Sequence, residues 1–191
     1  MNIGLDIDNV ISDFDRVTFP LFLKEDKKKR NAGIVDAKAH YMGGMFDWSK
    51  EEVEEFLVAT CEENARFLPL RKNAKKYIDL LLKQGHNIIL ISHRAFPTFK
   101  NPREVTVNWL KNKKINYTKL ILSESADKTQ ECVENAVDVM FDDRYNQVVK
   151  MRQKGVNCVM VLTKYNRQNK NLPFVSSFKG IYDYISKLNK N

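Results

Sequence analysis

Five short apolar runs, separated by segments of helical periodicity, most constrain what this chain can fold into. The runs have strand length and cover residues 2–6, 87–92, 119–123, 138–142 and 157–162. Continuous apolar runs are typical of parallel strands that are buried on both faces. Strands that alternate with helices form parallel sheets joined by right-handed crossovers. We therefore predict an α/β fold, with a parallel sheet of about five strands and helices on both of its faces.

Capping residues and apolar faces mark the helices between these strands. Asn73 begins one helix and Gly85 ends it, while Ser177 begins the last helix of the chain. Three further helices are expected over residues 104–113, 127–136 and 145–154. Residues 163–173 are polar and are predicted to form a loop.

Residues 15–70 interrupt the alternation, because their apolar periodicity is helical only. Ser12 with Asp15 resembles a capping box, so we expect a helix there that Pro20 kinks or ends. Ser49 with Glu52 marks a second helix. We predict that residues 1–14 and 71–191 form the core domain, and that residues 15–70 are a helical insertion overhanging the strand ends.

Charge and composition limit the partners of the chain. Its 191 residues carry a net charge of +8, which favours anionic partners. The one dense basic run, residues 24–30, contains Glu25 and Asp26, so we interpret it as a solvated helix end; nucleic acid is disfavoured as a partner but not excluded. No apolar run has membrane-spanning length, which predicts a cytoplasmic protein. The three cysteines lack metal-ligand spacing and are expected to be buried free thiols.

Polar side chains gather where the predicted strands end. Ligands of open parallel sheets bind beyond the carboxyl ends of the strands, and carboxylates placed together there suit a hard cation such as Mg²⁺. The candidate residues are Asp6 and Asp8 after the first strand, Ser92 and His93 after the second, Lys128 near the start of the helix after the third, and Asp142 and Asp143 after the fourth. Together they predict a Mg²⁺ and phosphate site.

In this order, these motifs resemble the four motifs of the haloacid dehalogenase (HAD) superfamily. The helical insertion after the first motif is similar to the type-1 cap of that superfamily. Residues 5–8 and 141–144 most resemble the 5′(3′)-deoxyribonucleotidase group. Two places depart from the usual pattern: Asn9-Val10 stands where Gly-Thr or Gly-Val is commoner, and residues 92–94 read Ser-His-Arg. The resemblance implies a HAD-like Rossmannoid core with a small α-helical cap.

The resemblance also implies catalytic and metal-binding roles. Asp6 would attack phosphorus to form an aspartyl-phosphate. Asp8 would protonate the leaving oxygen and then accept a proton from water. Mg²⁺ would be bound by Asp6, by the backbone carbonyl of Asp8 and by one of Asp142 and Asp143, with the other acid acting through water.

Three further residues are expected to bind the phosphate. Ser92 would donate a hydrogen bond to a phosphoryl oxygen, and Lys128 would pair with the phosphate and the nucleophile together. His93 is a candidate contact as well, although a loop histidine often bonds to the backbone instead. Arg94 and Arg144 either attract phosphate or pair with local acids, and we leave them outside the predicted site.

We therefore expect a Mg²⁺-dependent phosphomonoester hydrolase, a 5′-nucleotidase acting on deoxyribonucleoside or ribonucleoside monophosphates. The alternatives are a HAD phosphatase acting on a sugar phosphate or a nucleic-acid end, and a non-catalytic phosphate-binding protein. The sequence leaves open whether the protein forms a homodimer. Five aromatic residues of the insertion either pack together or stack on a base: Phe19, Phe22, Tyr41, Phe46 and Trp48.

Overall fold

The computed structural model describes residues 1–39, 41–164, 166–167 and 171–189. Within them, six parallel strands form one sheet in the order β3-β2-β1-β4-β5-β6. The strands are β1 (Asn2–Leu5), β2 (Asn87–Ser92), β3 (Lys119–Leu122), β4 (Val139–Asp142), β5 (Cys158–Val161) and β6 (Phe174–Val175). The predicted α/β fold with a parallel sheet is confirmed.

The sixth strand, β6, was not predicted from the sequence. It has two residues and pairs with the outer edge of β5, with Phe174 opposite Met160. Two apolar residues are too few to show a strand pattern. The loop predicted over residues 163–173 precedes β6; its residues 165 and 168–170 lie outside the described residues.

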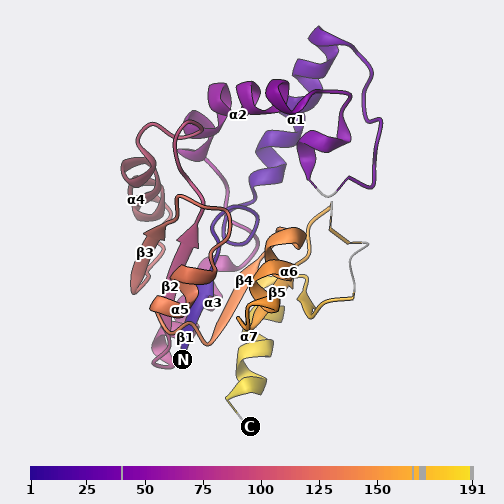
Figure 1. Ribbon diagram of the computed structural model, residues 1–191. Coiled ribbons are helices and arrows are strands. Elements are labelled where there is room, and N and C mark those ends of the chain that lie inside the picture. Colours follow the sequence, from indigo (N-terminus) through magenta and orange to yellow (C-terminus); the bar gives the residue numbers. More distant parts are fainter. Residues whose placement is uncertain (40, 165, 168–170, 190–191) are drawn as a thin grey trace.

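Helices cover both faces of the sheet, as predicted (Figure 1). The strand residues on one face pack against three helices, and those on the other face pack against two. Each face has its own hydrophobic cluster. The first face carries α3 (Ala74–Lys83), α4 (Pro102–Asn112) and α7 (Phe178–Leu188), and the second α5 (Thr129–Glu134) and α6 (Tyr145–Gln153). Alternate residues of a strand point to opposite faces, so the central strands β2, β4 and β5 contribute to both clusters.

The position of β1 between β2 and β4 sets where the site lies. Leu5 is in register with Leu90 on one side and with Phe141 on the other. The pairing continues one residue further, because the Asp6 amide donates to the carbonyl of Phe141 at 3.0 Å. Asp6 and Asp142 therefore leave adjacent strands at the same edge of the sheet.

The helical insertion lies over the carboxyl ends of the strands (Figure 1). It comprises α1 (Phe14–Lys29), the short 3-10 helix η1 (Met42–Met45) and α2 (Lys50–Ala65). Its elements share a third hydrophobic cluster, in which the rings of Phe22 and Phe46 stack at 5.4 Å. Trp48 packs on Phe22 at 5.2 Å and donates from Nε1 to Asp26. Aromatic packing thus gives the insertion a core of its own.

Helix α1 differs from its prediction in two ways. It begins at Phe14, and the Ser12 hydroxyl donates to Asp8 instead of capping the helix. It also continues through Pro20, whose ring is exposed, because Thr18 and Phe22 on either side of it are buried. The capping box of Ser49 with Glu52 at the start of α2 is confirmed.

The two connections between the insertion and the sheet run side by side. Ser12 forms an antiparallel bridge with Leu70, and the Asp13 amide donates to the carbonyl of Pro69 at 2.8 Å. Arg71 joins this connection to the rest of the core, because its guanidinium donates to the carbonyls of Asn9 and Leu162.

Three further expectations can be compared with the structure. Cys61, Cys132 and Cys158 are buried and free, as predicted. The basic run forms the end of α1, where Lys28 pairs with Glu25 and Arg30 with Glu52 at the surface. None of the helices in the described part of the chain has the length and apolar character needed to cross a bilayer.

Gly85, which follows α3, allows the left-handed backbone conformation at the end of this helix to be tested. Its φ of +80° lies in the left-handed region, and a Cβ there would meet no atom within 4 Å. We expect Gly85→Ala to lower the free energy of unfolding by about 1–2 kcal/mol through backbone strain alone. Gly85→Asn is the matched control and should cost less, because asparagine tolerates this conformation. Equal losses in urea unfolding of both variants would contradict this explanation.

Candidate active site

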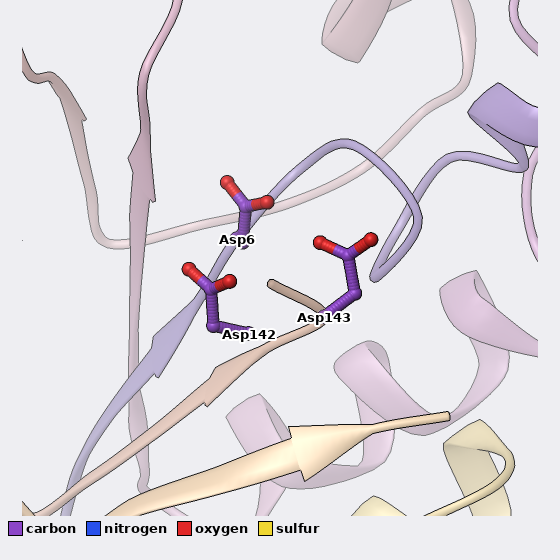
Figure 2. Close-up of side chains that lie close together, drawn as sticks. All are labelled: Asp6, Asp142 and Asp143. Atoms are coloured by element: carbon purple, nitrogen blue, oxygen red, sulfur yellow. The ribbon is translucent and has the colours of Figure 1, made fainter. Parts of the chain in front are cut away.

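Three carboxylates meet at the carboxyl ends of β1 and β4 (Figure 2). Asp6 follows β1, Asp142 ends β4 and Asp143 comes next in the chain. One ligand atom from each residue lies within 4.8 Å of the others. Asp6 and Asp142 are buried, with 4% and 0% of their surface exposed, whereas Asp143 is partly exposed. The parallel sheet thus brings together acids that are 136 residues apart in the sequence.

Lys128 provides the positive charge next to this cluster. Its Nζ lies 2.8 Å from Oδ1 of Asp6 and 2.7 Å from Oδ2 of Asp142. It occupies the N-cap position of α5 and is itself 2% exposed. The other oxygen of Asp142 accepts from the backbone amide of Arg144 at 2.8 Å. A buried lysine of this kind is stable only when its charge is compensated, and here two carboxylates compensate it.

The acids outnumber the nearby cation, and their pKa values reflect this. Burial, together with the charges of Asp142 and Asp8, raises the pKa of Asp6 to about 6, although Lys128 opposes the shift. Burial, then Asp142 and Asp6, hold the pKa of Asp143 well above its ordinary value. Burial opposes the charge on Lys128, but the two carboxylates outweigh it and raise its pKa. A further cation would therefore be stabilised among these oxygens.

The donor set suits a hard divalent cation. Carboxylate oxygens are the ligands that Mg²⁺ prefers, and one or two carboxylates are enough to bind it. Asp6, Asp142 and Asp143 supply such oxygens from two adjacent strand ends. The sequence analysis also named the backbone carbonyl of Asp8 as a ligand, and that role stays a prediction. The side chain of Asp8 is not among the carboxylates close enough to share an ion with Asp6, Asp142 and Asp143.

The predicted phosphate-binding residues line the same cavity as the acids. Ser92 ends β2, is 1% exposed and faces the cavity together with Lys128. His93 also lines the cavity but is exposed. Partial desolvation, followed by the charges of Arg144 and Lys128, lowers the pKa of His93. Six of the seven predicted site residues therefore line one cavity, and the seventh, Asp142, is fully buried and pairs with Lys128.

Asp8 faces a partner that the sequence analysis left outside the site. Its Oδ1 and Oδ2 accept from Nη2 and Nε of Arg94 at 2.7 and 3.0 Å. The Ser12 hydroxyl donates to the same Oδ1 at 3.1 Å. The sequence placed Arg94 two residues after Ser92 but did not show which acid it meets.

Asn9 is a second residue that sequence reasoning missed. Its φ of +62° lies in the left-handed region, which asparagine tolerates better than most residues. Its side chain donates to Oδ2 of Asp143 at 3.0 Å and accepts from the Asp15 amide at 3.0 Å. Asparagine thus takes the turn that glycine commonly makes here and also orients an acid of the cluster. Its presence at a glycine position was the one sequence signal.

The cavity above the acids has a volume of about 470 Å³ and lies between the sheet and the helical insertion. Its floor is formed by the polar residues of the strand ends. The insertion contributes mostly apolar side chains to its lining, including Phe22, Met42, Val53 and Leu57. Of the five aromatic residues, Phe22 and Tyr41 line the cavity, and Tyr41 is half exposed. This volume lies in the usual range for small-molecule sites.

Comparison with known proteins identifies one matching family model. The family described as 5′ nucleotidase, deoxy (pyrimidine), cytosolic type C protein matches residues 1–189. No curated protein matches the chain.

Many solved structures share the fold. A HAD family hydrolase from Deinococcus radiodurans, with bound phosphate and sodium, has a TM-score of 0.67 at 8% identity, over 98% of this chain and 96% of that chain. A phosphonoacetaldehyde hydrolase-like protein from Oleispira antarctica has a TM-score of 0.66 at 12% identity, over 99% and 92% of the two chains. At these identities, the likeness shows the fold alone.

Replacing Lys128 tests how the buried acids are held together. We expect Lys128→Met to lower the free energy of unfolding by roughly 3–5 kcal/mol, because it leaves buried carboxylates without their cation. Lys154→Met is the matched control, since the pair of Lys154 with Asp127 lies at the surface and should contribute less than about 1 kcal/mol. Urea unfolding without divalent cations measures both variants. Similar losses would show that Lys128 does not compensate the cluster.

Proposed function

The chain belongs to the family described as 5′ nucleotidase, deoxy (pyrimidine), cytosolic type C protein, a phosphatase family of the HAD superfamily, and we propose that it hydrolyses nucleoside monophosphates with the help of Mg²⁺. The observation that carries this proposal is the pairing of buried Asp6 with Lys128 beside two further acids, at the polar floor of a cavity that the insertion partly closes with apolar side chains. A cytoplasmic location fits the family description and stays a prediction.

In the proposed reaction, Asp6 is the nucleophile. One oxygen of its carboxylate bonds to phosphorus, and the bond from phosphorus to the leaving oxygen breaks. Asp8 donates a proton to that oxygen, so the nucleoside leaves as an alcohol. Water then attacks the aspartyl-phosphate and gives a proton to Asp8. The bond between Asp6 and phosphorus breaks, which releases phosphate and restores both carboxyl groups.

Lys128 and Ser92 support this reaction from the strand ends. The ammonium of Lys128, 2.8 Å from the nucleophile, would also pair with a phosphoryl oxygen bound next to Asp6. Ser92 faces the same space, so its hydroxyl would donate to another phosphoryl oxygen. His93, exposed at the rim, is proposed as a further phosphate contact.

The acid cluster is the proposed Mg²⁺ site. Asp6 and one of Asp142 and Asp143 would bind the ion directly, with the other acid acting through water and the backbone carbonyl of Asp8 as a further ligand. When bound, Mg²⁺ offsets the repulsion between phosphate and carboxylates and stabilises charge on the transferring group. The raised pKa values of Asp6 and Asp143 support this assignment, because burial and the repulsion between the acids disfavour their charged forms, and a bound cation would offset both effects.

The substrate class is inferred from the cavity lining. We propose that the insertion over residues 15–70 is a cap on the core formed by residues 1–14 and 71–191. Its apolar side chains would cover a nucleobase better than the hydroxyl groups of a sugar phosphate. A cavity of about 470 Å³ that the insertion partly closes also favours a small substrate over a nucleic-acid end.

The nucleophile is tested by Asp6→Asn. The amide cannot form the aspartyl-phosphate, so we expect turnover of nucleoside monophosphates to fall to background while the fold is retained. Phosphate release measures activity, and circular dichroism measures folding. Asp79→Asn is a surface control, because Asp79 lies on α3 away from the site. Full activity in Asp6→Asn would refute the assignment.

The metal site is tested by thermal unfolding with and without Mg²⁺. Free Mg²⁺ at 100 times its Kd should stabilise the protein by about 2.7 kcal/mol, and each kcal/mol should raise Tm by roughly 2–4 °C. Asp143→Asn should stabilise the metal-free protein, because neutralising a residue with a raised pKa removes repulsion. The same variant should lose most of the effect of Mg²⁺. An unchanged Tm with Mg²⁺, or activity in excess EDTA, would contradict the metal assignment.

The substrate class is tested by a screen of phosphate release. Deoxyribonucleoside and ribonucleoside monophosphates, sugar phosphates and end-phosphorylated oligonucleotides are compared at equal concentration. We expect the highest kcat/KM for nucleoside monophosphates. A preference for sugar phosphates or oligonucleotides would leave the phosphatase assignment standing and would contradict the proposed nucleotide substrate.

A further inference from the structure

Arg94 is a fully buried arginine that forms an ion pair with one acid, Asp8. It is 1% exposed, and its side chain forms a two-point hydrogen bond with Asp8, at 3.0 Å from Nε and 2.7 Å from Nη2. Among the described residues, no other acid lies within ion-pair distance of Arg94. A buried guanidinium is costly unless it is paired and hydrogen-bonded. The position of Arg94 is therefore explained by Asp8.

The remaining surroundings of Arg94 hold the guanidinium still. Its Nη1 donates to the hydroxyl of Thr106, a buried residue of α4, at 3.1 Å. Its central carbon lies 5.4 Å from the ring centroid of Phe99 and 5.8 Å from that of Trp109. Trp109 in turn donates to the carbonyl of Leu68 at 2.9 Å. A planar guanidinium that is bonded and covered in this way has little freedom to rotate.

Asp8 needs such a partner because the strand does not orient it. β1 ends at Leu5, so Asp8 lies in the loop three residues further on. Its side chain is 24% exposed and lines the cavity next to Asp6. Without Arg94, only the Ser12 hydroxyl would bind this carboxylate among the described side chains. A general acid needs a fixed position, because small displacements lower its efficiency steeply.

We propose that Arg94 is a positioning residue, which fixes the plane of the Asp8 carboxylate so that one oxygen faces the leaving group and, later, the attacking water. This inference rests on the proposed hydrolase function, in which Asp8 moves the proton. Arg94 itself is covered by protein and does not touch the substrate. Its contribution should therefore be felt in turnover and not in substrate affinity.

A double-mutant cycle with Arg94→Lys and Asp8→Asn tests this inference. Lysine keeps the charge but not the two-point geometry. We expect Arg94→Lys to lower kcat for a nucleoside monophosphate about 10²-fold, within the range for general acid–base catalysis, with KM changed less than about threefold. In the Asp8→Asn background, Arg94→Lys should have no further effect, because the carboxylate that it orients is gone. p-Nitrophenyl phosphate, which has a better leaving group, keeps residual rates measurable.

Arg71→Lys is the matched control in both backgrounds. Arg71 is a half-buried arginine near the site, but its guanidinium bonds to backbone carbonyls. We expect Arg71→Lys to change kcat by the same factor in the wild-type background and in the Asp8→Asn background. Equal losses from Arg94→Lys in the two backgrounds, or no loss in either, would overturn the positioning role.

Thr106→Val keeps the inference testable if Arg94→Lys does not fold. It removes one partner of the guanidinium at nearly constant volume, and should lower kcat by a smaller factor that disappears in the Asp8→Asn background. An unchanged kcat, or a loss that persists there, would contradict the inference. The wild-type protein is assayed first. If it hydrolyses no phosphomonoester, the proposed function fails; if it is active and the cycle is additive, only the role of Arg94 fails.

Discussion

Lys128 lies between two buried carboxylates, and the arrangement of the site depends on this interaction. Its ammonium is 2.8 Å from Asp6, which directly follows β1, and 2.7 Å from Asp142, which ends β4. Two buried acids so close together repel each other, and burial with this repulsion raises the pKa of Asp6 to about 6 even though Lys128 opposes the shift. The lysine compensates part of this charge and links α5 to the sheet. The part that it leaves uncompensated is what makes the cluster suited to a metal ion.

The strand order explains why such distant residues meet. β1 lies in the centre of the sheet, with β2 and β4 on its two sides. All three strands are parallel, so the residues that follow them emerge at one edge. Ser92 and Asp142 are thereby brought to either side of Asp6, and the crossover to α5 adds Lys128. The helical insertion begins directly after the loop that follows β1, so it lies over the same edge of the sheet.

The loops at this edge account for the two departures from the usual HAD pattern. Asn9 adopts a left-handed conformation and uses its side chain to bind Asp143, which glycine could not do. Arg94 turns away from the cavity and binds Asp8 among aromatic rings. Both unusual residues thus act on an acid of the site.

The sequence by itself determined the fold class and the order of the site motifs. Apolar runs, caps and periodicity are local, so they report strands and helices directly, and polar residues at strand ends indicated Asp6, Ser92, Lys128 and Asp142. The course of α1 past Pro20 and the pairing of the short β6 depended on packing between distant segments. The partners of Asp8 and Asn9 were decided by the tertiary structure for the same reason: Arg94 and Asp143 lie 86 and 134 residues away. No local pattern records such contacts, because they form only when the crossovers bring the loops together.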